Sequence, residues 1–387
     1  MPCLNEAATL DACISSARTA IHRHGLSAEI IVADNDSEDG SPQLALRAGV
    51  RVVRASERGY GSAIRAGIES ARGAFVIIGD ADLSYDFAEI LPFVEKLRQG
   101  YDLVVGNRFR GGIDAGAMPW KHRYLGNPVL SAIGRLFFQA PLGDFHCGLR
   151  GLRRDAYARL GLRTAGMEFA SEMVIKAALQ GMRVTEIPTV LHRDGRNRPP
   201  HLRSWRDGWR HLRFMLLFSP RWLFLYPGAA LMAGGIAVSA WLMGGPRLIG
   251  GVGFDIHTLL VAGFGCVIGY QLIVFAIFTR VYAMRTGFLP PQPLLNRMMR
   301  RITLETGVLA GAGLLLAGLF ALGIAVASWR AVDFGALDPR VTMRALIPSL
   351  VLLAIGFQTV FASFFLSILG IDQQVERGRA EAEVRAA

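Results

Sequence analysis

Four long stretches without a charged residue constrain the fold of this chain more than any other feature. They span residues 223–243, 258–278, 307–328 and 346–369. Each is close to the ~20 residues that cross the hydrocarbon core of a bilayer as a helix. A buried helix of a soluble protein rarely stays uncharged over such a length, so the sequence predicts four transmembrane helices. The composition agrees, because 52% of the 387 residues are hydrophobic, which is high for a soluble enzyme.

The distribution of arginines predicts how these helices are oriented. Arginines cluster over 193–221 and over 280–301, whereas the loop between the first and second stretches contains Arg247 alone. Cytoplasmic loops carry an excess of Lys and Arg. We therefore expect a multi-pass protein of the cell inner membrane whose amino-terminal domain faces the cytoplasm. A third cluster, in the loop 329–345, fits this orientation less well; its members are Arg330, Arg340 and Arg344.

The net charge of +11 does not predict nucleic-acid binding. No RNA- or DNA-binding module is recognisable, and basic clusters beside membrane helices are typical of contact with lipid headgroups and phosphates. The four cysteines have no metal-ligand spacing and predict no disulfide framework. A membrane, and no nucleic acid, is therefore expected among the partners.

By composition the chain divides into four segments. Residues 1–200 show the patterning of a globular α/β domain, and residues 222–370 hold the four predicted spans. Between them, residues 201–221 place tryptophans on one helical side and arginines on another, which predicts an amphipathic interfacial helix. A helix that faces a protein core is the alternative. Residues 371–387 are expected to form a cytosolic tail.

The segment Phe75–Asp82 carries the clearest chemical signal. Its apolar run ends at Gly79, which is typical of a buried strand, and Asp80 and Asp82 follow at the end where α/β sheets place ligands. Residues two apart in an extended segment point to the same face, so both carboxylates can reach one ligand. One carboxylate can therefore contact a sugar while the other binds a hard divalent cation, Mg²⁺ or Mn²⁺. An Asp-rich turn without a ligand is the alternative.

Other polar residues follow further predicted strands. Residues 29–33 form an apolar strand that leads into the polar run 34–41. Residues 2–7 resemble the end of a strand that turns into a helix, although no strand precedes them; the first strand is apparently missing, and we favour a late start of the sequence over a fold without this strand. Gly59 and Gly61 open a helix and predict N–H groups available to an anion. The β-α-β-α-β order predicts a doubly wound, mostly parallel sheet.

Taken together, these motifs resemble family 2 glycosyltransferases of the GT-A fold. More narrowly, they are similar to the dolichyl- and polyprenyl-phosphate sugar synthases, of which dolichol-phosphate mannose synthase is typical. The resemblance implies a Rossmann-like GT-A domain followed by an all-α domain of four transmembrane helices, and it covers about residues 2–200. It rests on the ordered series Pro2-x-x-Asn5-Glu6, Asp34-Asn35-x-Ser37-x-Asp39-Gly40, Gly59-x-Gly61, Asp80-Ala81-Asp82-Leu83-Ser84 and Gly106-Asn107-Arg108-Phe109.

This resemblance also implies roles for individual residues. Asp80 and Asp82 correspond to the metal and diphosphate site and Arg108 to an arginine that meets phosphate, so these three are the expected catalytic residues. The positions that would support the sugar and the active site are Asp144, Gly148 and Glu172. The positions that would line the nucleotide are Pro2, Leu4, Asn5, Glu6, Ala33, Asp34, Asn35 and Ala81.

Three departures from the family pattern stand out. Asp36 occupies a position where the family commonly has Gly, and Tyr85-Asp86 replaces a His pair. The family's Arg-x-x-Gly-x-Ser-Lys segment appears as residues 193–198. Within that segment Arg193 is favoured, over the two later arginines, as the residue that closes over the diphosphate.

The acceptor implied by the resemblance is a lipid monophosphate. Such a group is already an anion near neutral pH, so it needs cations and alignment more than a general base. The expected cations are Arg108, Lys121, Arg123 and Arg193. Two of them precede an apolar helix, residues 129–138, that could rest on the membrane. A solvated basic face is the alternative, because exposed Lys and Arg are common.

We therefore expect a membrane-bound, metal-dependent enzyme that moves a sugar from a UDP- or GDP-sugar to polyprenyl phosphate with inversion at C1. Related enzymes are compatible with a homo-oligomer. A processive polysaccharide synthase is a second hypothesis, but the Gln-x-x-Arg-Trp segment of that group is not found in this sequence. A non-catalytic scaffold or a lipid-linked sugar translocator is a third, and the intact Asp80, Asp82 and Arg108 argue against it.

Overall fold

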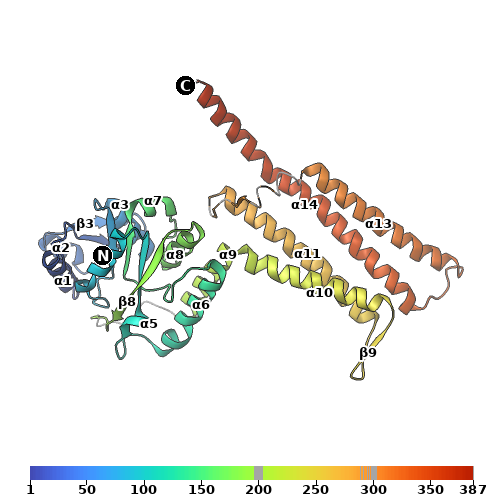
Figure 1. Cartoon of the computed structure of the whole chain (residues 1–387), viewed down its shortest axis with the longest axis horizontal. Helices are drawn as coiled ribbons and strands as arrows, with labels where there is room; N and C mark the ends of the chain where they lie inside the picture. The colour runs from blue at the N-terminus through green and yellow to red at the C-terminus, as the bar shows by residue number, and fades with distance from the viewer. Residues whose placement is uncertain are drawn as a thin grey trace. The chain divides into compact units, whose positions relative to one another are not determined.

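The computed structural model describes residues 1–195, 204–287 and 303–386, together with 289, 290, 292, 293, 295 and 297. The chain forms two compact units, Met1–Ser219 and Pro220–Ala387 (Figure 1). Arg196, Arg198 and residues 201–203 of the predicted interfacial helix lie outside the described residues.

The first unit begins with a small parallel sheet of order β1-β2-β3. Residues 2–3, where no full strand was expected, form a two-residue strand that pairs with β2. Apolar residues of β1, α1, β2 and α2 share one core cluster with Ala81, which lies in the turn after β4. The elements are β1 (Pro2–Cys3), α1 (Leu10–Arg23), β2 (Ile31–Asp34), α2 (Ser41–Arg47), β3 (Arg51–Arg54) and α3 (Tyr60–Ser70).

A second sheet has the order β4-β7-β5-β8-β6, in which β7 is antiparallel to both of its neighbours. The remaining pairs, β5-β8 and β8-β6, are parallel. Leu103, Val104 and Val105 in the middle of this sheet are at most 1% exposed, as expected for a central strand covered on both faces. The strands are β4 (Phe75–Ile78), β5 (Leu103–Asn107), β6 (Gly112–Ile113), β7 (Arg150–Arg153) and β8 (Val184–Leu191).

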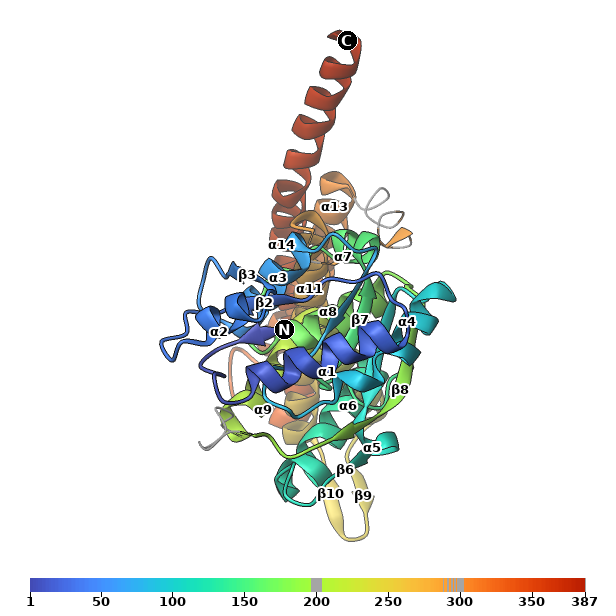
Figure 2. The ribbon, with the colours of Figure 1, turned by 90° about the vertical axis from the view of Figure 1, so that its left-hand side faces the viewer.

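Helices cover these sheets (Figure 2). The buried face of α1 packs against Phe87 and Ile90, which follow β4. The last helix of the unit, α9, packs against α6 and α8 and buries His211, Met215 and Phe218 at helical spacing. The helices are η1 (Phe87–Glu89), α4 (Leu91–Arg98), α5 (Arg108–Gly111), η2 (His122–Gly126), α6 (Asn127–Phe138), α7 (Arg154–Leu160), α8 (Phe169–Leu179) and α9 (Ser204–Phe218).

The second unit confirms the four predicted spans. Its long apolar helices cover Arg221–Met243, Ile256–Arg285, Leu304–Arg330 and Pro339–Leu369. The second span extends beyond residue 278, the predicted end, and therefore carries Arg280 and Arg285 on the helix. The elements are η3 (Arg221–Leu225), α10 (Tyr226–Met243), the hairpin β9 (Arg247–Ile249) and β10 (Val252–Phe254), α11 (Ile256–Arg285), α13 (Leu304–Arg330) and α14 (Pro339–Ala386).

Small residues bring these helices close together. A Cβ on Gly269 of α11 would lie 2.5 Å from the backbone nitrogen of Met232 and 2.6 Å from the carbonyl oxygen of Gly228, both in α10. Between α13 and α14, a Cβ on Gly311 would lie 3.0 Å from the carbonyl oxygen of Gly356. Close backbone approach at small residues is a common mode of helix association in membranes.

Two of the arginines that fit the predicted orientation less well have a structural role, because they pair with an acidic side chain. Asp255, just before α11, pairs with Arg344 and lies 3.8 Å from Arg340, both of which are in α14. Arg344 also donates to the carbonyl oxygen of Leu242 at the end of α10. These arginines therefore link α14 to the end of α10 and the start of α11, and Asp255 balances part of their charge.

Candidate active site

The turns after β1 and β4 are joined by hydrogen bonds at the carboxyl ends of the strands. Thr9 Oγ1 donates to the carbonyl oxygen of Ala81 at 2.7 Å and lies 3.3 Å from that of Glu6. The backbone N–H of Asn35, after β2, donates to the carbonyl oxygen of Cys3. The predicted nucleotide-lining residues thus lie in β1 and at the end of β2, and in the turns after β1, β2 and β4; they are Pro2, Leu4, Asn5, Glu6, Ala33, Asp34, Asn35 and Ala81.

Many polar side chains in these turns organise the turns themselves. Asn5 has a positive φ of 56°, and its Oδ1 accepts from the N–H of Glu38 at 2.8 Å. Asp34 accepts from the N–H groups of Asp36 and Ser37, which is an Asx-type turn. Both carboxylate oxygens of Asp34 therefore take part in the hydrogen bonding of the turn itself.

Asp36, which replaces the usual glycine, has a φ of +72°. Glycine adopts this conformation most easily, and Asp is among the few other residues that tolerate it. The side chain adds a contact that glycine cannot make, because its oxygens accept from Arg54 at 2.7 Å and from Arg58 Nε at 2.8 Å. The departure from the family pattern therefore ties two arginines to the rim of this turn.

Two N–H groups around the start of α3, where Gly59 and Gly61 predict an anion site, already have partners within the protein. The N–H of Gly59 donates to Asn35 Oδ1 at 2.9 Å, and that of Ser62 donates to the carbonyl oxygen of Ala165 at 3.1 Å. A Cβ on Gly61 would lie 2.6 Å from the carbonyl oxygen of Thr164. The glycines are needed because the backbone of residues 164–166 packs directly on them, which no local pattern reveals.

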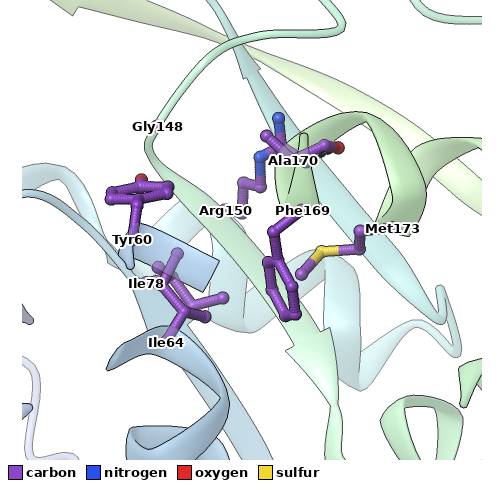
Figure 3. A pocket seen from close by; sticks show the side chains of 8 residues that line it. All are labelled: Tyr60, Ile64, Ile78, Gly148, Arg150, Phe169, Ala170 and Met173. Carbon is purple, nitrogen blue, oxygen red and sulfur yellow. Dashed lines mark hydrogen bonds between the residues drawn. The ribbon is translucent and has the colours of Figure 1, made fainter. Parts of the chain in front are cut away.

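Asp80 and Asp82 have different surroundings. Asp80 Oδ1 accepts from the hydroxyl of Tyr60 at 3.0 Å. Burial and the nearby Asp80 raise the pKa of this phenol, which therefore remains a donor. Asp82 is 6% exposed, and its Oδ1 accepts from the backbone N–H of Ser84 at 3.0 Å. A small apolar pocket lies between α3 and α8 (Figure 3), lined by residues that include Tyr60, Arg150 and Phe169.

This donor set fits a cation that arrives with a substrate. Within the described part of the chain, no group of three or more His, Cys, Asp or Glu side chains could hold a metal ion. Mg²⁺ is commonly bound by one or two carboxylates together with substrate phosphates. The carboxylate pair Asp80 and Asp82 matches the protein's share of that pattern.

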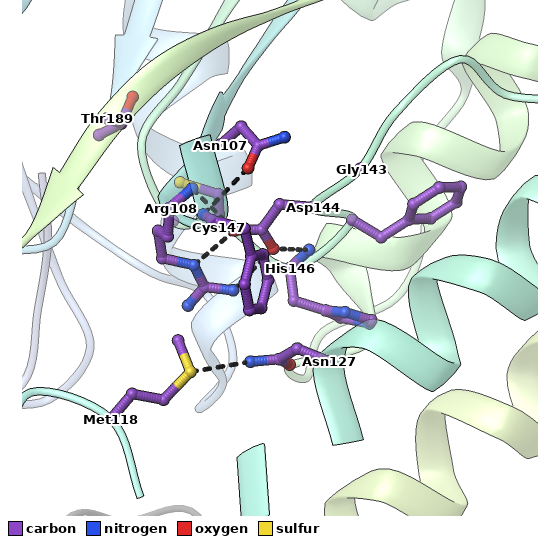
Figure 4. Close-up of polar contacts among 12 residues, drawn as sticks. Asn107, Arg108, Met118, Asn127, Gly143, Asp144, His146, Cys147 and Thr189 are labelled. Atoms are coloured by element: carbon purple, nitrogen blue, oxygen red, sulfur yellow. Dashed lines mark hydrogen bonds and ion pairs between the residues drawn. The ribbon is translucent and has the colours of Figure 1, made fainter. Parts of the chain in front are cut away.

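Arg108 and Asp144, predicted to contact different parts of the substrate, form a buried ion pair (Figure 4). Arg108 Nε lies 2.6 Å from Asp144 Oδ2 and Nη2 lies 2.8 Å from Oδ1, so the pair is bidentate. The two side chains are 9% and 0% exposed. Asp144 therefore fixes the guanidinium of Arg108, which is the first residue of α5 and directly follows β5.

The loop that carries Asp144 and Gly148 is held by side chains from several parts of the fold. Glu186 of β8 accepts from the N–H groups of Gly143 and Asp144. Arg150 donates to three carbonyl oxygens, those of Phe145, Cys147 and Ala170. Tyr85, which replaces a family histidine, accepts from the N–H of Gly148 at 2.9 Å.

Two histidines in edge-to-face contact link the same loop to α9. Ser171 Oγ lies 3.3 Å from His146 Nε2 and 2.9 Å from His211 Nδ1, and the two rings pack edge to face at 4.6 Å. Burial, His211, Arg108 and Arg150 hold the pKa of His146 well below its usual value. No local pattern indicates this role of His146, because its partners Ser171 and His211 lie 25 or more positions away along the chain.

Glu172 supports the site indirectly. It is 2% exposed on α8, pairs with Lys176 at 2.7 Å and accepts from the N–H of Thr164 at 2.9 Å. Burial opposes the charge on Glu172, but Lys176 and Thr164 outweigh it and lower its pKa. Glu172 thereby fixes the segment that packs on Gly59 and Gly61.

The remaining predicted cations lie on the surface of the unit. Lys121 is exposed, and Arg123 lies over the ring of Tyr124. Arg193 is held near the turn that carries Asp80 and Asp82. Two residues later, Gly195 donates its N–H to the carbonyl oxygen of Asp82 at 2.9 Å. Large apolar side chains are exposed around Lys121 and Arg123; they are Trp120, Tyr124, Leu125, Val129 and Leu136.

Comparison with known proteins agrees with this architecture. Residues 1–161 match the family described as glycosyl transferase family 2, and residues 277–370 match the glycosyltransferase family 2 C-terminal transmembrane region. A low-salt glycan biosynthesis hexosyltransferase of Haloferax volcanii is 36% identical over 96% of this chain and 88% of that protein. A dolichol-phosphate mannosyltransferase of Pyrococcus furiosus is 27% identical over 49% of this chain and 54% of that protein.

Among solved structures, glucosyl-3-phosphoglycerate synthase from Mycobacterium tuberculosis, in complex with Mn²⁺, UDP and glucosyl-3-phosphoglycerate, has a TM-score of 0.43. It is 20% identical and covers 56% of this chain and 75% of its own.

The fold and the site define an α/β transferase of the GT-A type that is joined to four membrane-spanning helices. The protein is thus an integral membrane enzyme. The chain belongs to glycosyltransferase family 2, and the resemblance inferred from its motifs is confirmed.

Proposed function

We propose that this enzyme transfers a sugar from a UDP- or GDP-sugar to a polyprenyl phosphate, with inversion at C1 and with Mg²⁺ or Mn²⁺. The observation that carries the proposal is the exposed surface at residues 120–136, where large apolar side chains surround Lys121 and Arg123. Aromatic and basic residues together are typical of a surface that meets lipid headgroups. Relatives named for dolichyl- and undecaprenyl-phosphate substrates support the same acceptor class.

The donor would lie on the turns after β1, β2 and β4. A bound divalent cation at Asp80 and Asp82 would neutralise charge on the departing diphosphate. Tyr60 holds the carboxylate of Asp80 in place, and Ser84 holds that of Asp82. These contacts hold the carboxylates in position before substrate arrives, so little reorganisation is needed during the reaction.

The acceptor phosphate would be met by cations. Asp144 orients Arg108 with two hydrogen bonds, and the remaining guanidinium N–H groups would donate to the phosphate. A hydrogen bond from Asn127 to Met118 Sδ, 3.5 Å long, spans the segment that carries Lys121 and Arg123 (Figure 4). Because the phosphate oxygen is already an anion, alignment beside C1 replaces general-base catalysis.

Orientation in the membrane follows the charge distribution. The arginine clusters before the first span and after the second are at one end of the helices, and cytoplasmic loops carry such an excess. Asp255 offsets part of the charge of Arg340 and Arg344 at the other end. The proposal therefore places the catalytic unit on the cytoplasmic face of the cell membrane, and a homo-oligomer is compatible with it.

Incubation of the purified full-length protein with labelled nucleotide sugars and undecaprenyl phosphate tests the proposal. We expect label in the lipid extract, and we expect EDTA to abolish transfer and Mg²⁺ or Mn²⁺ to restore it. Labelled polymer would indicate a processive synthase instead. A panel of UDP- and GDP-sugars that yields no labelled product would count against the transferase assignment.

We expect Gly148→Ala to lower the rate of sugar transfer by about 10²-fold, which a misplacement of roughly 1 Å can cause. A Cβ at this position would lie 2.5 Å from Asp80 Oδ2 and 3.0 Å from Tyr85 Cε2, so the carboxylate must move. Gly208→Ala in α9 is the matched control, because a Cβ there meets no atom within 4 Å. Equal transfer rates for the two variants would contradict the placement of Asp80.

A further inference from the structure

Two arginines approach each other at one end of the membrane unit. Arg221 begins η3, which packs against α11, and Arg280 lies on α11. Arg280 is only 9% exposed, although it carries a full charge. With its amide oriented to satisfy its hydrogen bonds, the side-chain oxygen of Gln292 accepts from Nη2 of both arginines, at 3.2 Å for Arg280.

Among the described side chains, no carboxylate balances this pair. Among the side chains that the structure describes, neither guanidinium forms an ion pair with an acid. The sequence contains no Asp or Glu between Asp207 and Asp255, or between Asp255 and Glu305. Asp255 precedes the first turn of α11, about 38 Å along the helix from Arg280 at 1.5 Å per residue, and it already pairs with Arg344.

Such an arrangement is costly unless an anion completes it. Burying an unpaired charge costs several kcal/mol, and a second cation nearby adds repulsion. Gln292 supplies an oxygen to both guanidinium groups, but a neutral amide cannot cancel their charge. An anionic oxygen in the same position would satisfy the same donors and neutralise the pair as well.

We propose that Arg221, Arg280 and Gln292 form a binding site for a phosphate group carried by a membrane lipid. Phosphate offers several acceptor oxygens to converging guanidinium forks. The position favours a lipid, because Arg221 begins one candidate span and Arg280 lies near the end of another. Basic pockets between membrane helices near the cytoplasmic surface bind phosphorylated headgroups.

This site contains none of the residues assigned to sugar transfer. It therefore goes beyond the proposed function, and it can be tested without an activity assay.

Native mass spectrometry of the full-length, delipidated protein tests the site directly. Three probes are used: phosphatidic acid, which is a phosphate monoester; phosphatidylglycerol, which is a phosphate diester; and inorganic phosphate. We expect one retained phosphatidic acid adduct in the parent protein, and at least a tenfold loss of its occupancy in Arg280→Gln and in Arg221→Gln. Arg330→Gln, at the exposed far end of α13, is the matched control and should keep the adduct.

Thermal unfolding gives a second readout. In lipid-free detergent, Arg280→Gln should unfold at the same temperature as the parent protein or a higher one, because it removes an unbalanced charge. Phosphatidic acid should raise the midpoint of the parent protein but not that of the variant. A lower midpoint of Arg280→Gln without lipid, or lipid adducts that survive both substitutions, would overturn the proposal.

The three probes also show whether the bound phosphate comes from a lipid headgroup or from free inorganic phosphate. If inorganic phosphate stabilises the parent protein as much as phosphatidic acid does, and Arg280→Gln removes both effects, the site binds phosphate but a lipid origin is excluded. Stronger retention of the monoester than of the diester would support a dianionic headgroup as the ligand.

Discussion

Asp82→Asn is expected to lower sugar transfer by about 10²–10³-fold, the range seen when one preorganised electrostatic contact is removed. The substitution keeps an oxygen that can accept from the N–H of Ser84, now 3.0 Å from Asp82 Oδ1, so the turn should persist. It removes the negative charge that a hard divalent cation requires. The measurement is the rate at which labelled sugar enters the lipid extract, together with the unfolding midpoint of the protein in detergent.

Asp86→Asn provides the comparison for this variant. Asp86 lies four positions further along and caps η1 by accepting from the N–H of Ala88 at 2.8 Å. Asn caps a helix about as well as Asp and keeps an accepting oxygen, so this variant should be nearly as stable as the parent protein and leave transfer intact. Near-normal transfer by Asp82→Asn would mean that this carboxylate does not hold a metal.

Asp144→Asn is expected to destabilise the catalytic unit by about 3–5 kcal/mol, the usual cost of breaking a buried ion pair from one side. Asp144 is fully buried and accepts two side-chain hydrogen bonds from Arg108 as well as the backbone N–H of His146. The variant leaves the guanidinium of Arg108 buried without a counter-charge. Denaturant unfolding of the parent protein and the variant in the same detergent measures the difference.

Two further variants show whether burial causes this loss. Asp155→Asn breaks a bidentate pair with Arg153 of similar length, but those side chains are 59% and 36% exposed. Because exposed pairs contribute about 0–1 kcal/mol, this variant should be almost as stable as the parent protein. Arg108→Met combined with Asp144→Leu should recover stability relative to Asp144→Asn alone, yet transfer no sugar. Equal losses in the buried and exposed pairs would contradict this account.

Most of the architecture could be predicted from local patterns. The four uncharged stretches predict membrane helices because the hydrocarbon core offers no partner for a charge, and the structure confirms all four. An apolar run that ends in Asp80 and Asp82 predicts a strand end at a ligand-binding edge, and β4 ends at Ile78, just before them. In both cases the information lies within one element.

The tertiary structure alone decided which polar groups meet. Arg108 pairs with Asp144, 36 positions away, and Glu186 holds the same loop from a third strand. Gly59 and Gly61 proved to be packing positions because a distant backbone segment lies against them. The unbalanced Arg221 and Arg280 are likewise brought together by helix packing. Local sequence specifies the elements, whereas hydrogen bonds and charges are satisfied by neighbours in space, so the partner of a buried polar group becomes known only once the chain is folded.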